Sequence, residues 1–341
     1  MNDITTSVHG FLQTGQRTCY DPHGREIPCQ GTGQDAVFSS GHAWPKTRFE
    51  VSGNIVLDRL TDLMWLQNAN IAEFPFSWRE ALAFVTEMNA TSEFGFSDWR
   101  LPNRRELRSL ISYQTRRPSL PEDHPFTNIF AHWYWSSTTA AAHPDHAWYV
   151  NLDGGRMFYG GKDQAYMVWP VRSSGNATLP RTGQIRCYDE SGQVVACSKT
   201  GQDGEYRYGL PWPEPRFECR QHGILDQLTG LLWGCNADLA ACPVSWAEAL
   251  AEITRLNTDG TSANWRLPNI NELESLVDCA QYKPALPAHH PFNNVQDIYW
   301  SSTTSLYEPD WAWALYLDKG ATGVGQKSFA RFHVWPVTDL L

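Results

Sequence analysis

Residues 98–103 read Asp-Trp-Arg-Leu-Pro-Asn, and residues 264–269 read Asn-Trp-Arg-Leu-Pro-Asn. Downstream of each, Tyr-Trp-Ser-Ser occurs at 134–137 and again at 299–302. Upstream, Thr-Gly-Gln occurs at 14–16 and 182–184, and Cys-Tyr-Asp at 19–21 and 187–189. The offset shortens slightly along the chain, so short loop deletions separate two copies of one unit. A repeat this long indicates a duplicated domain, because solenoid repeats are about 20–50 residues long.

These matches divide the chain of 341 residues into four parts. We predict a tail at 1–13, a first domain at 14–172, a linker at 173–181 and a second domain at 182–341. The linker is short and polar and contains a proline. Two domains also suit a chain longer than one hydrophobic core normally organises.

Composition excludes several classes of protein. Charged residues are only 19% of the chain, with 25 Gly, 21 Pro and 16 Trp, which favours short strands and turns over long solvated helices. The formal charge of -10 argues against a nucleic-acid partner. No apolar run approaches the roughly 18 residues of a membrane helix, so no membrane insertion is expected. Residues 1–13 lack the apolar core of a signal peptide, so we expect that any export signal has already been removed.

Eight cysteines are present, and none forms a Cys-x-x-Cys pair typical of zinc or thiol redox sites. Cys19 and Cys29 flank a turn between strand-like arms, as do Cys187 and Cys197, so each pair is predicted to form a disulfide. Disulfides persist in oxidising compartments. The expected location is therefore secreted, cell-surface or periplasmic.

The other four cysteines occur only in the second copy. Cys219 aligns with Val51 and Cys279 with Tyr113, so a Cys219–Cys279 disulfide would replace a contact between those two residues. Cys235 and Cys242 would then close their own short loop. Four cysteines allow three pairings, and the sequence leaves the choice open.

Two helices are predicted in each copy from capping boxes. Ser77 with Glu80 begins the first helix, and Asn103 with Glu106 begins the second; the same spacing recurs in copy two. Strand-like segments precede and follow the helices. The order of hairpin, strand, two helices and several antiparallel strands predicts an α+β domain.

Several motifs together resemble one family. Asp-x-x-Thr-x-Leu-x-Trp at 58–65 and 226–233, Trp-Arg-Leu-Pro-Asn, Glu-Leu-x-Ser-Leu, Tyr-Trp-Ser-Ser and Val-x-Pro-Val stand in the order typical of domain of unknown function 1566, also called the Lcl C-terminal domain. The resemblance covers nearly all of the chain. It implies a C-type-lectin-like fold in two tandem copies and a role in adhesion to glycosaminoglycans or other extracellular targets. It supplies no catalytic residues, so the chain is not expected to be an enzyme.

Tryptophans give the first candidate binding residues. Fourteen of the 16 fall into seven pairs matched between the copies, which predicts structural positions in a shared scaffold. Trp133 and Trp311 have no Trp counterpart and align with Ile298 and His146. We therefore select Trp133, Trp311 and His146 as candidate ligand contacts.

An arginine-rich stretch gives the second set of candidates. Arg104, Arg105, Arg108, Arg116 and Arg117 have no arginine counterparts in copy two. They could form an anion site for a sulfated glycan or a carboxylate-rich partner. The alternative, which we favour, is a solvated helix face with local salt bridges.

No cofactor is expected. Calcium is the alternative, because lectin-like folds often bind it, although no stretch has the dense carboxylate alternation of an EF-hand loop. No Gly-x-Ser-x-Gly elbow is present, and no Ser, His and acid set recurs in both copies.

The leading hypothesis is an extracellular binding or adhesion protein that recognises a glycan or protein ligand through the loops in which the copies differ most, at 114–133, 138–147, 281–298 and 303–312. A subunit of a self-assembling surface fibre is the alternative. An enzyme of the formylglycine-generating type would need reactive cysteines.

Overall fold

The structure is a computed structural model that describes residues 10–176, 178–258 and 264–339. In the first copy the elements are β1 Cys19–Tyr20, β2 Glu26–Ile27, α1 Asp35–Phe38, β3 Phe49–Ser52, β4 Ile55–Asp58, β5 Leu63–Leu66, α2 Trp78–Ala90, η1 Glu93–Gly95, α3 Arg104–Ser109, β6 Trp133–Ala140, β7 His143–Asn151, β8 Met157–Gly161 and β9 Val171–Arg172. In the second they are β10 Cys187–Tyr188, β11 Val194–Val195, α4 Asp203–Tyr206, β12 Phe217–Arg220, β13 Gly223–Asp226, β14 Leu231–Trp233, α5 Trp246–Thr258, α6 Ile270–Ser275, β15 Ile298–Thr304, β16 Trp311–Tyr316, β17 Ala321–Gln326 and β18 Val337–Asp339.

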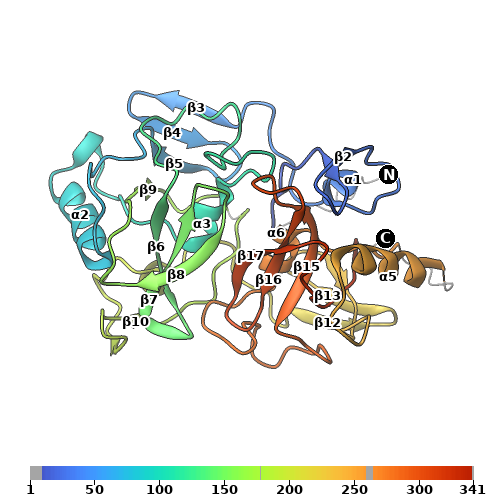
Figure 1. The fold of residues 1–341 in the computed structure, drawn as a ribbon. Helices are drawn as coiled ribbons and strands as arrows, with labels where there is room; N and C mark the ends of the chain where they lie inside the picture. Colours follow the sequence, from blue (N-terminus) through green and yellow to red (C-terminus); the bar gives the residue numbers. More distant parts are fainter. Residues whose placement is uncertain (1–9, 177, 259–263, 340–341) are drawn as a thin grey trace, which may run out of the picture.

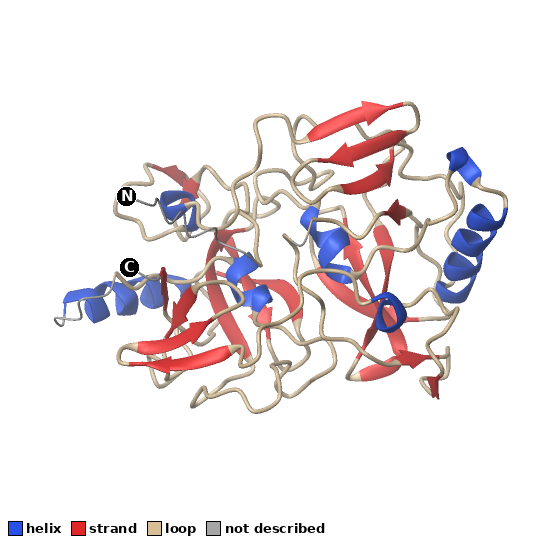
Figure 2. Cartoon of the chain, turned by 180° about the vertical axis from the view of Figure 1, so that it is seen from behind, coloured by secondary structure: helices blue, strands red, loops and turns tan. Residues whose placement is uncertain are grey.

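Both copies combine helices with antiparallel sheets. Each has a two-stranded hairpin and a four-stranded sheet, in the order β3-β4-β5-β9 in copy one and β12-β13-β14-β18 in copy two. The longer strands of both copies join in one six-stranded sheet, in the order β15-β16-β17-β8-β7-β6. The predicted mixture of helix and antiparallel sheet, repeated twice, is confirmed. Figures 1 and 2 show α2 and α5 at opposite ends of the molecule.

The six-stranded sheet is centred on a pair of equivalent strands. β8 pairs with β17 antiparallel, and Met157 lies opposite Thr322. These two residues are equivalents, because Val150 faces Met157 within copy one as Leu315 faces Thr322 within copy two. When equivalent positions contact each other, the interface has two-fold symmetry. The two copies are therefore related by an approximate two-fold axis within a single chain.

The Trp-Arg-Leu-Pro-Asn motif forms the start of α3. The Asn103 side chain accepts hydrogen bonds from the backbone N–H groups of Arg105 and Glu106, and the Glu106 carboxylate accepts from the backbone N–H of Asn103. Arg100, which is buried, donates to both oxygens of Glu106 at 2.6 and 2.7 Å. Asn269, Glu272 and Arg266 repeat this arrangement at α6. The predicted capping boxes are confirmed.

The N-terminal hairpins are exchanged between the copies. Figure 1 shows β2 and α1, in blue, beside the orange and red strands of copy two. Asn271 Nδ2 on α6 donates to the carbonyl of Leu12 at 2.8 Å. Residues 1–9 of the predicted tail lie outside the described residues, whereas Phe11 and Leu12 are buried. Each predicted domain is thus completed by the hairpin segment of the other.

Buried hydrogen bonds hold each exchanged hairpin against the other copy. The buried Asp35 carboxylate accepts hydrogen bonds from Thr14 of its own segment and from Thr303 of copy two, both at 2.7 Å. The Gln16 side chain exchanges two hydrogen bonds with the backbone of Thr304. In the opposite direction, Asp203 binds Thr182 and Thr138, and Gln184 binds the backbone of Thr139. Burial raises the pKa of Asp35 and of Asp203 to about 6.

A buried lysine of the opposite copy also contacts each exchanged hairpin. Lys162 donates to the carbonyls of Tyr188 and Asp189 in the hairpin of copy two. Its equivalent, Lys327, donates to the carbonyls of Tyr20 and Asp21 in the hairpin of copy one. Burial lowers the pKa of both lysines to about 7.

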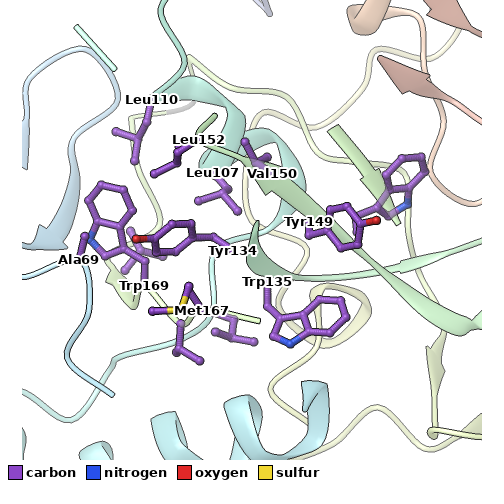
Figure 3. Close-up of a cluster of buried hydrophobic side chains, with 14 of the residues drawn as sticks. Ala69, Leu107, Leu110, Tyr134, Trp135, Tyr149, Val150, Leu152, Met167 and Trp169 are labelled. Atoms are coloured by element: carbon purple, nitrogen blue, oxygen red, sulfur yellow. The ribbon is translucent and has the colours of Figure 1, made fainter. Parts of the chain in front are cut away.

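Most matched tryptophans lie in the core, as predicted. Twelve of the fourteen are buried: Trp65, Trp78, Trp99, Trp135, Trp148, Trp169, Trp233, Trp246, Trp265, Trp300, Trp313 and Trp335. Figure 3 shows part of the core of copy one, where Trp169 and Tyr134 pack near Leu107 of α3 and near Leu110, which directly follows α3. Trp44 and Trp212 form the seventh pair and are partly exposed.

The cysteines divide into two groups. Cys19–Cys29 and Cys187–Cys197 are disulfides, as predicted. Cys219, Cys235, Cys242 and Cys279 are free thiols.

The prediction that these four cysteines form disulfides is therefore wrong, and for the Cys219–Cys279 pairing the reason is a difference in burial. Cys219 is exposed on β12, whereas Cys279 is buried after α6. Their counterparts in copy one do not pack together either, because Val51 is exposed and Tyr113 is buried against Trp313 at a ring distance of 5.0 Å. Cys235 and Cys242, predicted to bond with each other, are both exposed thiols.

Candidate ligand-binding hollow

The arginines of α3 lie between the copies and not on the surface. Arg104, Arg105 and Arg108 are 0%, 4% and 6% exposed. Arg104 and Arg108 each contact the carboxylate of Glu274 on α6, at 3.1 and 3.2 Å. These three residues therefore form neither the solvated helix face that we favoured nor a surface site for a sulfated glycan. The sequence could not reveal this, because no local pattern marks a helix face that another copy covers.

Arg116 and Arg117 are exposed on the loop after α3. Arg117 forms a solvent-exposed ion pair with Asp153 at 3.2 Å, and the carbonyl of Arg116 accepts from the backbone N–H of Gly154. Arg116 and Arg117 are therefore exposed, whereas the arginines of α3 are buried.

His146 and Trp311 occupy equivalent strands near the exchanged hairpins. His146 Nδ1 lies 2.9 Å from Asp145 Oδ1. A Cβ added to Gly192, at the tip of the copy-two hairpin, would lie 2.9 Å from the backbone nitrogen of Asp145. A Cβ on Gly24 would likewise lie 2.8 Å from the backbone nitrogen of Asp310, next to Trp311. Residues 144–145, at the start of β7, and residues 309–310, just before β16, belong to the predicted recognition segments 138–147 and 303–312 and are therefore contacted by hairpin tips.

Trp133 lies on the six-stranded sheet and is partly exposed. Its ring centroid is 4.3 Å from that of Tyr149, and Tyr149 lies 4.8 Å from Tyr166. The Tyr166 hydroxyl donates to Gln164 Oε1 at 2.6 Å. The three rings form an aromatic cluster in which Tyr149 is buried.

A hollow of about 360 Å³ forms where the N-terminal segment meets the loop after α3. We call it the Trp44 hollow. Its lining residues are Gln13, Thr14, Gly15, Gln16, Arg17, Ser39, Trp44, Ser112, Gln114, Pro121, Glu122 and Asp123. This volume lies in the usual range for a small-molecule site, about 300–1,000 Å³. Part of the predicted recognition loop 114–133 therefore does line a concave surface.

Local contacts fix the position of Trp44. Its indole Nε1 donates to the carbonyl of Gln13 at 3.1 Å, and the Arg48 guanidinium lies 4.9 Å from its ring centroid. Gly15 has a φ of 80°, and a Cβ there would lie 2.7 Å from the indole ring. A glycine is thus required both for the backbone conformation and for the close approach of the ring.

Polar and charged groups surround the indole. Arg17 and Glu122 form an ion pair at 3.2 Å in which both side chains are 67% exposed. Gln114 Oε1 accepts from the backbone N–H of Arg17 at 2.6 Å. Asp123 adds a second exposed carboxylate. Beside the hollow, burial lowers the pKa of His124, which opposes protonation of its imidazole near neutral pH.

The corresponding part of copy two differs in shape and chemistry. A hollow of about 270 Å³ there is lined by Gln184, Ile185, Arg186, Tyr188, Cys279, Ala280 and Gln281, with Ala141 from copy one, and Trp212 does not line it. Ile185 and Ala280 replace Arg17 and Gln114, and Ala288 and His289 replace Glu122 and Asp123. The polar set around Trp44 is therefore specific to copy one.

Sequence reasoning missed Trp44 because Trp212 matches it, which suggested a purely structural role. A usable signal was nevertheless present in the residues near it. Arg17, Gln114, Glu122 and Asp123 all change between the copies, although the flanking motifs match.

No group of three His, Cys, Asp or Glu side chains able to hold a metal ion occurs among the described residues. Within the same residues, none of the helices has the length and apolar character needed to cross a membrane.

Comparison with known families gives a match in both halves of the chain. The model of the Lcl C-terminal domain family matches residues 54–172 and 222–338. Both matched segments begin after the exchanged hairpin, near β4 and β13. No curated protein matches the chain.

Proposed function

Because the chain belongs to the Lcl C-terminal domain family, with two tandem copies of the domain, we propose that it is a non-catalytic extracellular adhesion protein that binds a glycan in the Trp44 hollow. The observation that carries this proposal is a partly exposed tryptophan in a concave site where Arg17, Gln114, Glu122 and Asp123 have no counterpart of the same residue type in copy two. A purely structural tryptophan does not need these four polar side chains. Trp212 occupies the equivalent position of copy two, where other residue types replace all four.

The chemistry of the hollow suits a sugar ring. The apolar face of a pyranose can pack against the Trp44 indole, because aromatic side chains combine a large apolar surface with a defined geometry. The ring hydroxyls can then donate to the carboxylates of Glu122 and Asp123 and to the amide oxygen of Gln114. Two carboxylates and one arginine disfavour a sulfated ligand, so the expected ligand is a neutral or amino sugar.

The proposal also covers the location of the protein and the fold class of each copy. Two disulfides favour an oxidising compartment, which supports a secreted, cell-surface or periplasmic protein. A C-type-lectin-like fold for each copy agrees with two helices packed beside antiparallel strands. No metal or other cofactor is part of the proposed binding step.

The test compares two variants of matched structural context. Trp44→Ala and Trp212→Ala each remove an indole that donates to a backbone carbonyl and stacks on an arginine. We expect a glycan array to identify a ligand for the unmodified chain, and calorimetry to show at least a tenfold loss of affinity for Trp44→Ala with little loss for Trp212→Ala. Equal affinity of the two variants, or no glycan bound by the unmodified chain, would contradict the proposal.

A fibre subunit remains the second candidate, because an exchanged hairpin could in principle dock on another molecule. In the structure both hairpins dock within their own chain, and a closed two-fold arrangement leaves no hairpin site for a neighbour. This supports discrete particles. Electron microscopy of the purified chain distinguishes them from filaments.

A further inference from the structure

The space between α3 and α6 holds more positive than negative charge. Arg104, Arg105 and Arg108 are all buried, and Glu274 is the carboxylate that pairs with Arg104 and Arg108. Arg105 has no ion pair among the described residues. Instead its Nη2 donates to the backbone carbonyls of Val277 and Ser275, at 2.7 and 3.4 Å. A buried guanidinium without a counter-charge is costly unless another group compensates it.

Two hydrogen-bond donor nitrogens of Arg105 also lack a partner. Its Nε and Nη1 are buried and have no hydrogen-bond partner among the described residues, and the same holds for Nε of Arg108 and for Nε and Nη1 of Arg104, although Arg104 does not line the cavity described below. Buried polar groups in folded proteins almost always have a partner, which can be an ion or a water molecule. The unpartnered nitrogens therefore indicate that something occupies the space beside them.

Neighbouring charged groups do not supply that partner. Arg48 and Arg216 are each matched by their own aspartate, in bidentate pairs with Asp58 and Asp226. The thiol of Cys279 stays protonated, because burial raises its pKa to about 12.

Asp278 is a second acid whose charge interacts with Arg105, besides Glu274. Burial raises the pKa of Asp278, which weakens it as an anion, while its Oδ1 accepts from the backbone N–H of Ala280. Desolvation also lowers the pKa of Arg105 itself, as expected for a buried cation that lacks a directly bonded carboxylate.

A small cavity lies beside the unpartnered side chain. It is lined by Arg105, Arg108, Asn271 and Glu274, together with Ser109 and Ile111, the segment 10–13 and residues 179–180. Its volume is about 30 Å³. That is room for roughly two water molecules. That space also fits one halide ion.

We propose that this cavity is a binding site for a chloride-sized anion, which compensates the guanidinium of Arg105 and joins the two copies. The site combines Arg105 and Arg108 of α3 with Asn271 and Glu274 of α6, and the N-terminal segment closes it. It does not depend on the Trp44 hollow or on glycan binding. Because the anion would bind only the assembled pair of copies, chloride should stabilise the folded chain.

The test measures thermal unfolding of the full chain in chloride and in gluconate at matched ionic strength. Gluconate is too large for the cavity. We expect the Tm to rise by roughly 2–3 °C for each tenfold increase of chloride above its Kd. Bromide should act like chloride, and ion chromatography should detect chloride released when gel-filtered protein is unfolded in chloride-free buffer.

Variants of Arg105 and of Arg104 test whether the chloride response comes from this cavity. Arg105→Gln removes the charge beside the cavity and should abolish the difference between chloride and gluconate. Arg104→Gln is the matched control: it removes a buried arginine of the same interface that does not line the cavity, so it should lower the Tm but keep the chloride response. Arg105→Lys, which keeps the charge without the planar donors, replaces Arg105→Gln if that variant does not fold, and should weaken the response. An equal Tm of the unmodified chain in chloride and gluconate, or a full response in the Arg105 variants, would overturn the proposal.

Discussion

Arg108 and Glu274 occupy equivalent positions of the two copies and form an ion pair at 3.2 Å. The pair lies next to the approximate two-fold axis, where equivalent positions meet each other. Identical residues at such a position would place like charges together. The divergence of one copy to Arg and of the other to Glu therefore produces attraction between them.

Removing the carboxylate should destabilise the whole chain. Glu274→Gln leaves the buried Arg104 and Arg108 without their shared carboxylate, and breaking a buried ion pair costs about 3–5 kcal/mol. Urea unfolding followed by tryptophan fluorescence measures the change. Glu218→Gln is the control, because the exposed Glu218–Arg220 pair should contribute no more than about 1 kcal/mol. Equal effects of the two variants would show that Glu274 does not hold the interface.

The exchanged hairpins should keep the copies together when the linker is cut. A protease site inserted at 174–178 would separate residues 10–173 from the second half, yet each half retains the hairpin on which the other depends. We expect both fragments to elute together in gel filtration after complete cleavage, and to separate only in denaturant. Elution as two independent species without denaturant would contradict the exchange.

Folding stability should respond to pH through the two buried aspartates. Their pKa is raised from 3.8 to about 6, so the folded state holds these protons more tightly than the unfolded state. Their stabilising contribution is therefore complete below about pH 4 and is lost as the pH rises through 6, at about 3 kcal/mol for each group.

The measurement compares the unmodified chain with the double variant Asp35→Asn and Asp203→Asn between pH 4 and pH 7. Subtracting the two unfolding free energies removes the contribution of the other ionisable groups. The difference should fall with rising pH. A difference that is constant over this range would mean that neither aspartate has a raised pKa.

The four free cysteines should differ in reactivity. Cys219, Cys235 and Cys242 are exposed, whereas Cys279 is buried and its thiol pKa is raised to about 12. A thiol reagent should label three sites rapidly in the native protein and the fourth only after unfolding. Cys279→Ser should leave the native count at three, and Cys219→Ser should reduce it to two. Rapid native labelling of Cys279 would place it outside the core.

Much of the local structure of each copy could be predicted from short-range sequence patterns. The capping boxes at Asn103 and Asn269 and the hairpin disulfides depend on residues that are close in sequence, so their spacing alone indicates the structure. Matched tryptophans identified most of the core for a related reason. A large aromatic side chain retained at the same position of both copies usually fills the same space in each.

The candidate site was predictable only in part. Loop divergence pointed to residues 114–133, which do line the Trp44 hollow, but Trp44 itself lies far before Gln114 in the sequence and comes close only through the fold. The arginines of α3 were misplaced for a similar reason. Their pattern on the helix is compatible with solvent, and burial follows from the packing of a second copy against them.

The sequence by itself determined that there are two copies, that each contains two helices begun by capping boxes, and that Cys19 pairs with Cys29 and Cys187 with Cys197, because those features follow from local spacing and from comparison of the halves. Only the tertiary structure decided that the hairpins are exchanged, that α3 faces α6, and that four cysteines remain free. These outcomes depend on which surfaces of two nearly equivalent units bury each other. That choice is made by contacts between residues from opposite ends of the chain, such as Gln16 with Thr304, and no local pattern encodes it.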